Sequence, residues 1–453
     1  MSLLSHHRWI PALALPLLAC VPLACSGSGN DSKDDNARSE NTSPSSQLSP
    51  ADEMAFQAIV QHPTKDNCAE VAIGSARCLS KVRVDDQGQV QSFATPTSGF
   101  GPPDLISAYN IPSSGTSTGT IAIVDAYDDP TAEADLGVYR SNYGLSACTT
   151  ANGCFKKVSQ SGSTTTLPAT DTGWAGEISL DLDMASAICP ACKIVLVEAN
   201  SASYADLGTA VNQAATQGAT VISNSYGGTE SSSNSNYDSL YYNHPGVAIF
   251  ASSGDAGYSG GTQYPAAGAN VIAVGGTSLT KSTTTSRGWV EKVWGSSTAG
   301  ANGAGSGCSN YTTRPSWATA AASPNCSNKT VADVSAVADP NTGVAVYLTT
   351  GGSGWVVYGG TSAASPIVAS IFALTGNGKA TGSFIWSHTS SFYDSTSGTN
   401  YNGASASTGG KTCSVGTNNL CNGVTGFDAP TGWGSPNTAA ILALAADAGT
   451  DGG

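Results

Sequence analysis

The stretch Gly359–Leu374, GGTSAASPIVASIFAL, joins a tight turn to an apolar helix. Its two leading glycines allow a close approach of another backbone, and Ile367, Ile371 and Leu374 recur at the spacing of one buried helix face. Ser362 is therefore expected at a helix N-terminus, where N–H groups stabilise a developing negative charge. This position suits a nucleophilic serine. The alternative is a glycine-rich turn capped by Ser or Thr.

Apolar strands alternate with helices before this stretch. Such runs predict a parallel sheet covered by helices on both faces, which is an α/β fold. In such a sheet the site lies at the carboxyl ends of the strands, and Asn224–Gly228 and Ser253–Asp255 each follow a predicted strand. The predicted strands are 120–124, 193–197, 219–223, 248–252 and 271–274, and the predicted helices are 177–187, 204–217 and 362–374.

A nucleophilic serine needs a base that takes its proton, and histidine is the common one. After residue 25 the histidines are His62, His244 and His388, and none stands in a His-Gly-Thr sequence at the start of a predicted helix. A Ser-His-Asp hydrolase is therefore disfavoured. This alternative, a histidine-dependent hydrolase, predicts that activity is highest at neutral or alkaline pH.

Carboxylates are the other candidate base. Glu177 and Asp181 are four residues apart in a predicted helix, so they lie about 40° apart around its axis. Like charges at this spacing raise one pKa and favour a shared proton, which suits a base that works in acid. Asp183 is expected to point elsewhere, about 240° from Glu177. The alternative is a solvated acidic face.

Asp255 follows a predicted strand within the sequence FASSGDAG, residues 250–257. A protonated carboxyl group there could donate a hydrogen bond to an oxyanion. The alternative is an ordinary aspartate in a turn.

Taken together, these features resemble the sedolisins, the serine-carboxyl peptidases. The resemblance spans roughly residues 100–440. It implies a subtilisin-like fold with Ser362 as nucleophile and Glu177 as general base. It also implies that Asp181 orients Glu177 and that Asp255 belongs to the oxyanion hole. The motifs that carry the resemblance are Glu177-x-x-x-Asp181, Ser253-Gly254-Asp255, Gly360-Thr361-Ser362 with Pro366, Tyr264–Thr277 and Ala332–Pro340.

The same resemblance implies one calcium ion near the C-terminus, held by carboxylates and backbone carbonyls in turn-rich loops. Asp394 and Asp428 would supply side chains. Carbonyl oxygens would come from Ser395, Val424 and Gly426. Position 424 is Val where the family tends to have Gly. The alternative is a loop that is stiffened by a disulfide alone.

Charged residues make up only 11 % of the chain, against roughly 25 % in ordinary globular proteins. The formal net charge of −14 argues against nucleic acid or an anionic membrane surface as a partner. Residues 1–25 have the pattern of an export signal. Cys20 and Cys25 are candidates for the lipid-accepting cysteine of a bacterial lipoprotein, and plain secretion is the alternative. No later segment is apolar over the ~18 residues that a membrane span needs.

Of 12 cysteines, ten remain when Cys20 and Cys25 are set aside. An even number in an exported chain predicts disulfides between neighbours along the sequence. For Cys189 and Cys192 the alternative is a redox or zinc motif. The surrounding sequence offers no thioredoxin-like pattern, no second cysteine pair and no nearby histidine, so a structural disulfide is favoured. The predicted pairs are Cys68–Cys78, Cys148–Cys154, Cys189–Cys192, Cys308–Cys326 and Cys413–Cys421.

The expected function is that of a monomeric, exported or lipid-anchored endopeptidase of the bacterial cell envelope. It would hydrolyse peptide bonds at acidic pH and bind calcium. The alternative from another class is a catalytically inactive cell-surface binding protein on a peptidase fold. The expected parts are a signal peptide at 1–25, a disordered linker at 26–50, a short pro-segment at 51–98, a sedolisin-like peptidase domain at 99–445 and a flexible tail at 446–453.

Overall fold

The structure, a computed structural model, describes residues 48–448 apart from Gly115, Pro324, Ser353, residues 404–411 and Thr417. The predicted signal peptide with Cys20 and Cys25, residues 26–47 of the predicted linker and residues 449–453 of the predicted tail lie outside the described residues. Among the residues that are described, no helix has both the length and the apolarity that crossing a bilayer requires.

Within the described part of the chain, the largest sheet has eight strands. Its neighbours follow the order β12-β11-β9-β7-β4-β6-β5, and β15 also pairs with β11. All these pairings are parallel except that of β11 with β12, so the predicted parallel α/β sheet is confirmed. The strands are β4 Thr120–Ala126, β5 Phe155–Ser159, β6 Lys193–Ala199, β7 Val221–Asn224, β9 Ala248–Ser252, β11 Ile272–Lys281, β12 Trp289–Val293 and β15 Val334–Val337.

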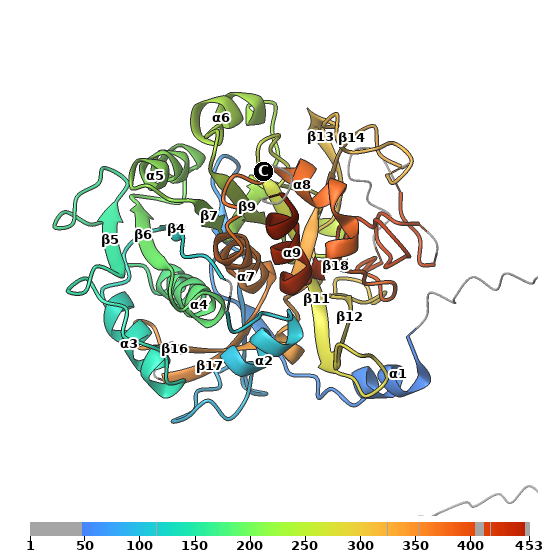
Figure 1. Cartoon of the computed structure of the whole chain (residues 1–453), viewed down its shortest axis with the longest axis horizontal. Coiled ribbons are helices and arrows are strands. Elements are labelled where there is room, and N and C mark those ends of the chain that lie inside the picture. The colour runs from blue at the N-terminus through green and yellow to red at the C-terminus, as the bar shows by residue number, and fades with distance from the viewer. Residues whose placement is uncertain are drawn as a thin grey trace, which may run out of the picture. The chain divides into compact units, whose positions relative to one another are not determined.

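Both faces of this sheet are covered. Successive side chains of a strand point to opposite faces, and in β4 Ile121 packs into one apolar core while its neighbour Ala122 packs into another. Helices α4 and α7 lie side by side over the first face, and α5 lies over the second (Figure 1). The helices are α1 Pro50–Gln57, α2 Pro102–Ala108, α3 Ala132–Asn142, α4 Thr172–Ile188, α5 Tyr204–Thr216, α6 Asn234–Tyr241, α7 Thr361–Leu374, α8 Gly382–Ser387 and α9 Thr438–Ala448.

Helix α7 is the predicted helix after the double glycine, and every one of its residues is buried. It follows Gly360, whose φ of 95° lies in the left-handed region that glycine adopts without strain. Helix α4 begins earlier than predicted, at Thr172, because Asp171 caps it by accepting hydrogen bonds from the N–H groups of Gly173 and Trp174. Helix α4 carries Glu177 and Asp181, and helix α7 carries Ser362.

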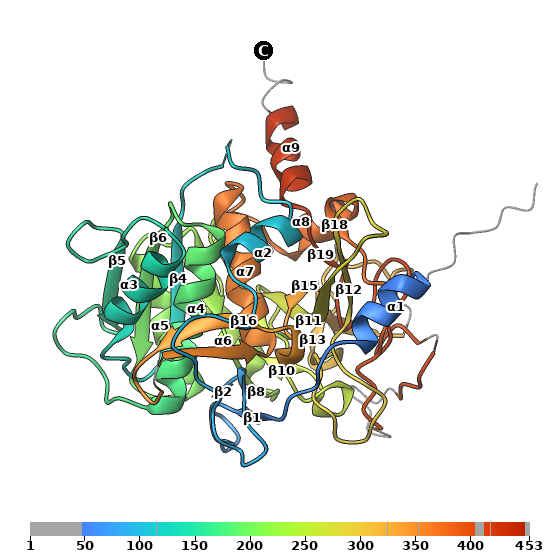
Figure 2. The ribbon, with the colours of Figure 1, turned by 90° about the horizontal axis from the view of Figure 1, so that it is seen from below.

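The N-terminal segment adds strands to two smaller sheets. Strand β3 lies between β1 and β17, which in turn pairs with β16, and β2 pairs with β8, which also pairs with β10. Figure 2 shows β1, β2 and β8 together at one edge of the molecule. Residues 51–98 therefore contribute strands to sheets of the main body. The strands are β1 Thr64–Asp66, β2 Arg77–Cys78, β3 Lys81–Arg83, β8 Tyr226–Thr229, β10 Gln263–Tyr264, β16 Val344–Leu348 and β17 Gly354–Gly359.

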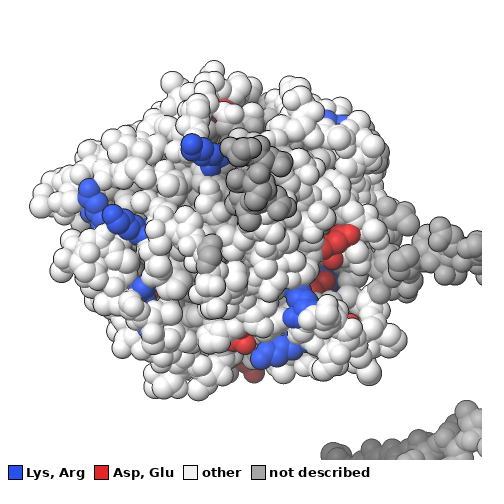
Figure 3. Space-filling model, viewed as in Figure 1, with Lys and Arg blue, Asp and Glu red and all other residues white. Residues whose placement is uncertain are grey.

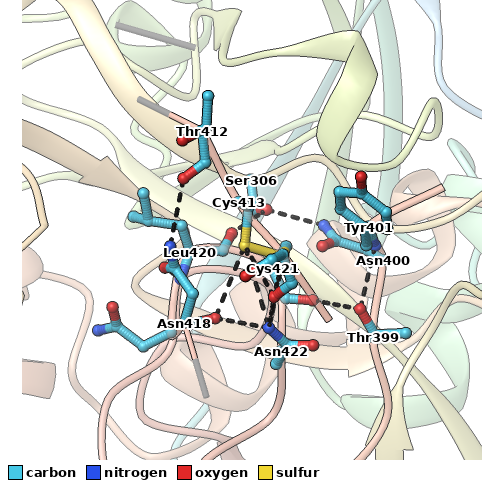
Figure 4. The surroundings of a disulfide bond; sticks show 12 residues. Ser306, Thr399, Asn400, Tyr401, Thr412, Cys413, Asn418, Leu420, Cys421 and Asn422 are labelled. Atoms are coloured by element: carbon cyan, nitrogen blue, oxygen red, sulfur yellow. Dashed lines mark hydrogen bonds between the residues drawn. A yellow bond between two sulfur atoms is a disulfide. The ribbon is translucent and has the colours of Figure 1, made fainter. Parts of the chain in front are cut away.

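All the predicted short-range disulfides are present, including that between Cys189 and Cys192. The last of them, Cys413–Cys421, is surrounded by amide side chains (Figure 4). There Asn422 Nδ2 donates to the carbonyl of Asn418 at 2.8 Å. The loop is therefore held by a covalent bond and by side-chain hydrogen bonds together. Two further pairs of strands complete the fold, β13 Gly307–Thr313 with β14 Asn328–Val331 and β18 Phe392–Tyr393 with β19 Ser435–Pro436.

A buried lysine fixes the loop that leads into β11. Lys329 of β14 is only 1 % exposed. Its Nζ donates to the carbonyls of Ala266, Gly268 and Val271 at 2.9, 2.6 and 2.7 Å. These bonds satisfy all three donors of the ammonium group. They hold residues 266–271 just before the strand begins.

Replacing this lysine should destabilise the protein. We expect Lys329→Met to lower the free energy of unfolding by on the order of 3 kcal/mol, because three buried carbonyls lose their donor. Urea unfolding followed by circular dichroism measures the loss. The matched control is Lys379→Met at an exposed position, and equal stability of the two variants would contradict the assignment.

Candidate active site

The predicted catalytic residues meet at the carboxyl ends of the parallel strands, where α/β folds place their sites. Asp255 follows β9, and Asp125 lies near the end of β4. Ser362 lies at the start of α7, while Glu177 and Asp181 lie on α4, the helix packed against it. Segments that are far apart in the sequence thus supply one site.

Ser362 is the second residue of α7 and is completely buried. Its Oγ donates a hydrogen bond to the carbonyl oxygen of Ser225 at 3.0 Å, and Ser225 Oγ donates to the carbonyl of Ser362 at 3.3 Å. Ser225 follows strand β7, so these bonds fasten the start of the helix to the edge of the sheet. The hydroxyl lies at the positive end of the helix dipole, which favours negative charge.

The carboxyl groups of Glu177 and Asp181 lie in the protein interior. Both residues are 0 % exposed, as is Asp125 of β4. Among the described residues, no donor forms a hydrogen bond of ordinary geometry with any oxygen of these three carboxyl groups. The alternative of a solvated acidic face is therefore wrong. Charged carboxylates in such surroundings are costly, so the group favours holding protons.

The pKa values of these carboxyl groups are shifted upward together. Burial raises the pKa of Glu177 and of Asp181 well above the ordinary range, and the charge of Asp125 raises both further. The nearby hydroxyls of Ser362 and Ser80 lower the pKa of Glu177 in part. Burial also raises the pKa of Asp125, to about 8. Carboxyl groups coupled in this way titrate as a cluster and share protons.

Asp125 is a site residue that the sequence analysis missed. It is the next-to-last residue of β4, whose sequence is TIAIVDA, and it is fully buried. An acidic residue near the carboxyl end of an otherwise apolar central strand was the available signal, because that end of the strand faces the site edge. Its place beside Glu177 depends on how the sheet and α4 pack.

Asp255 is also buried, and it binds the first residue of α7. Its Oδ1 accepts hydrogen bonds from the N–H of Thr361 at 2.8 Å and from Thr361 Oγ1 at 2.9 Å. Its Oδ2 has no such partner within the described structure. Burial raises the pKa of Asp255 to about 6, although the charge of Lys81 and the bonds from Thr361 oppose the shift. The alternative of an ordinary turn aspartate does not account for this link to α7.

The other titratable candidates make their recorded contacts with residues outside this cluster. Asp183 accepts a hydrogen bond from the N–H of Tyr347 in β16 at 2.9 Å, so the prediction that it faces elsewhere on α4 is confirmed. His244 Nε2 lies 2.8 Å from Asn212 Oδ1, and His388 Nδ1 lies 2.8 Å from the carbonyl of Phe384. Burial lowers the pKa of His62, and the charge of Arg83 lowers it further. Within the described chain, the group beside Ser362 is a carboxyl cluster.

The structure also brings together most of the predicted calcium residues. Asp394 Oδ2 accepts from the N–H of Gly426 at 2.7 Å, and Asp428 Oδ2 accepts from the N–H of Val424 at 3.1 Å. Burial raises the pKa of Asp428 well above its usual range, and the charge of Asp394 raises it further. Ser395 follows Asp394 and is fully buried. The described residues contain no cluster of three or more His, Cys, Asp or Glu side chains placed to hold a metal.

The fold and this site define a class of protein: a subtilisin-like α/β protein with a serine at the start of a central helix, next to buried carboxyl groups. Residues 171–434 match the Subtilase family, so the chain belongs to the subtilase family.

The individual relatives place it beside the sedolisins. Over 318 residues the chain is 30 % identical to kumamolisin from Bacillus sp. (strain MN-32), a match that covers 64 % of this chain and 54 % of kumamolisin. The chain thus spans about half the length of that curated relative. A solved structure of Pseudomonas sedolisin, a serine-carboxyl proteinase complexed with two molecules of pseudo-iodotyrostatin, matches with a TM-score of 0.62 and 26 % identity. That match covers 79 % of this chain and 100 % of the other. The predicted sedolisin resemblance and subtilisin-like fold are confirmed.

The buried carboxyl groups predict that acid stabilises the protein. A carboxyl group whose pKa is raised on folding binds more protons in the native state, so the free energy of unfolding falls as pH rises through the window between the two pKa values. For Asp125 that window runs from 3.8 to about 8. We expect the melting temperature to fall steadily across it. We also expect Asp125→Asn to make the decline in the free energy of unfolding smaller by on the order of a few kcal/mol.

Thermal unfolding by calorimetry at a series of pH values checks this expectation. Asp86→Asn, at an exposed position, is the matched control and should leave the decline unchanged. A melting temperature that rises from acid to neutral pH in the wild type would contradict it.

Proposed function

We propose that this chain is an exported serine-carboxyl endopeptidase that hydrolyses peptide bonds at acidic pH. The observation that carries the proposal is the burial of Ser362 at the start of α7 beside the carboxyl groups of Glu177 and Asp181. A serine in this position needs a base, and the neighbouring groups that can take its proton are carboxylates. The sedolisin likeness supports the same chemistry.

Proton transfer begins the reaction in this proposal. Ser362 Oγ attacks the peptide carbonyl carbon while the Glu177 carboxylate takes the hydroxyl proton. Asp181 and Asp125 share the remaining protons of the cluster and orient Glu177. Burial and the charge of Asp125 raise the pKa of Glu177, so its carboxylate, once formed, is a stronger base than an exposed one.

The tetrahedral intermediate needs donors for its oxyanion. The N–H of Ser362 at the start of α7 supplies one. The protonated carboxyl group of Asp255 supplies the other. Because the pKa of Asp255 is raised to about 6, this group can donate below that pH and loses the ability as pH rises above it. The leaving amine takes the proton from Glu177, and water then hydrolyses the acyl-enzyme.

The proposed location and partners follow from the composition. We expect an exported protein at the bacterial cell envelope or outside it, with peptide or protein substrates. A lipid on Cys20 or Cys25 would anchor it to the membrane. Short-range disulfides are the pattern of exported chains. In the face shown in Figure 3, lysine and arginine side chains are few and scattered, which fits a protein that does not bind nucleic acid. We expect it to act as a monomer.

Activity should depend on pH and on two residues. Cleavage of a denatured protein should be fastest in acid and fall above about pH 6, because Asp255 loses its proton there. Ser362→Ala should reduce the rate by on the order of 10⁶-fold. Glu177→Gln should also remove most of the cleavage activity, because the base is lost.

Matched controls lie on the same helices. Ser370→Ala on α7 removes a buried hydroxyl that has no hydrogen-bond partner among the described residues, and Asp183→Asn on α4 changes an acid that faces β16. Both should keep their activity. A folded wild type without activity at any pH would favour the alternative, a catalytically inactive binding protein. An optimum in alkali would favour a histidine-dependent mechanism.

We propose further that calcium binds at Asp394, Ser395, Val424, Gly426 and Asp428. The donor set is two carboxylates and three backbone carbonyls, which are the oxygen ligands that calcium prefers. The two acids are close enough for one charge to raise the pKa of the other, and no lysine or arginine contributes to either shift. A cation between them would remove that repulsion. When bound, calcium would tie the two loops together.

Removing calcium should lower the melting temperature. A ligand present at 100 times its dissociation constant stabilises the native state by about 2.7 kcal/mol, and a chelator abolishes that term. We expect Asp428→Asn to lose the chelator effect and the bound metal, measured by calorimetry with and without EGTA and by elemental analysis. Asp86→Asn should keep both. An identical melting temperature with calcium and with EGTA in the wild type would exclude a stabilising site.

A further inference from the structure

Asp255, the carboxyl group that the proposed mechanism uses as an oxyanion donor, opens a loop that is rich in glycine. The loop contains a short 3₁₀ turn, η1 Tyr258–Gly260. Gly257 and Gly261 flank this turn, with φ angles of 59° and 69° in the left-handed region. Glycine adopts that region without strain, but it also loses more conformational freedom on folding than any other residue. The loop therefore needs contacts from elsewhere in the chain to keep one conformation.

One set of contacts comes from the backbone of a second glycine-rich segment. The N–H of Gly303 donates to the carbonyl of Asp255 at 3.0 Å. The N–H of Gly257 donates back to the carbonyl of Gly303 at 2.8 Å. Beside this pair, the N–H of Gly305 donates to the carbonyl of Gly254 at 2.7 Å. This backbone bridge holds the main chain on both sides of the Asp255 side chain.

The side-chain amide of Asn402 makes a second set of contacts, and this residue is only 4 % exposed. Its Nδ2 donates to the carbonyl of Ala256 at 2.8 Å and to Ser259 Oγ at 2.9 Å. Its Oδ1 accepts from the N–H of Ser259 at 3.1 Å. The carbonyl oxygen of Ala301 is a further acceptor, 3.0 Å from Nδ2. The amide therefore joins the loop to the segment that precedes the backbone bridge.

The surroundings of this amide fit it closely. A Cβ built on Gly257 would lie 2.7 Å from Asn402 Nδ2 and 2.8 Å from the carbonyl oxygen of Asn400. That oxygen accepts from the N–H of Tyr258 at 2.8 Å, and Asn400 Nδ2 donates to Ser306 Oγ at 2.8 Å (Figure 4). Asn402 has a φ of 43°, a left-handed conformation that asparagine adopts more readily than most residues. Asparagine thus suits the position by its backbone and by its amide.

We propose that Asn402 is a positioning residue for the oxyanion donor: its amide keeps the loop after Asp255 in place, so that the carboxyl group of Asp255 stays buried at the start of α7. Asp255 Oδ1 is already held by Thr361, and its Oδ2 is the oxygen that would face the oxyanion. The inference rests on the proposed function and adds to it a residue that acts on the reaction only through Asp255.

The protonation of Asp255 depends on this burial. Burial is the largest cause of its pKa of about 6, while the charge of Lys81 and the bonds from Thr361 act in the opposite direction. The other charged groups that affect it are Asp66 of β1, which pairs with Lys81 of β3, and Glu177 of α4. A change in the loop leaves all these groups in the chain. If the loop opens, water reaches the carboxyl group and its pKa falls.

Asn402→Gly tests the proposal, because glycine accepts the left-handed backbone and only the amide side chain is removed. For a peptide that the wild type cleaves, we expect kcat to fall by on the order of 10- to 100-fold, with KM changed by less than about twofold. The pH at which activity declines should move from about 6 downward by on the order of one pH unit, because Asp255 loses its proton earlier.

A direct titration of Asp255 makes the test independent of turnover. The Ser362→Ala protein is labelled with ¹³C at its aspartate carboxyl groups, and the Asp255 signal is assigned by its loss in Asp255→Asn. NMR then follows this signal from about pH 3 to about pH 8, a range that includes the ordinary pKa of aspartate. We expect a midpoint of about 6 when Asn402 is present and a lower midpoint with Asn402→Gly.

Asn110→Gly is the matched control. Asn110 also has a left-handed φ, of 51°, but its amide donates to Asn437 Oδ1 away from this loop. This variant should keep the kcat, the pH profile and the Asp255 midpoint of the wild type. Ser259→Ala removes one acceptor of the Asn402 amide and should lower the midpoint by a smaller amount. It decides the matter if circular dichroism shows that Asn402→Gly does not fold.

The outcomes separate this inference from the proposed function. An active wild type whose Asn402→Gly and Ser259→Ala variants keep its pH profile and its Asp255 midpoint overturns the positioning inference alone. A lower melting temperature without any change in pH profile or midpoint shows a purely structural role and overturns it too. A folded wild type that cleaves nothing at any pH overturns the proposed function and this inference with it.

Discussion

The site depends on the burial of three carboxyl groups, those of Asp125, Glu177 and Asp181, without a basic side chain among the groups that shift their pKa values. Charge in such surroundings is expensive, and protonation relieves the cost. Folding and proton binding are therefore linked. A carboxyl group with a raised pKa also binds a proton more tightly than an exposed one once it is ionised.

Helix α7 connects this cluster to the rest of the molecule. All its residues are buried, and its start is fixed by the positive φ of Gly360 and by the hydrogen bonds that Thr361 donates to Asp255. The neighbouring bonds between Ser362 and Ser225 fasten it to the sheet. A helix held at its first turn gives the serine a fixed position, which catalysis by positioned groups requires.

The N-terminal segment packs against the main body next to the site. Its strands extend sheets of the main body, and between β2 and β3 it lays Leu79 across the start of α7. A segment of this length is too short to bury a core of its own. It is ordered by pairing with strand edges that lie near the site.

The sequence alone determined the features that depend on local spacing. Apolar periodicity predicted the parallel strands and α7, a four-residue spacing placed Glu177 and Asp181 on one helix face, and neighbouring cysteines predicted the disulfides. Only the tertiary structure decided that Asp125 joins those acids and that the Leu79 carbonyl meets the N–H of Ser362. Such contacts join residues tens to hundreds of positions apart, and the packing of whole elements brings them together. Helix and strand periods describe only near neighbours along the chain. The place of Asp125 in β4 indicated its edge of the sheet, but no local pattern could have indicated which residues it and Leu79 contact.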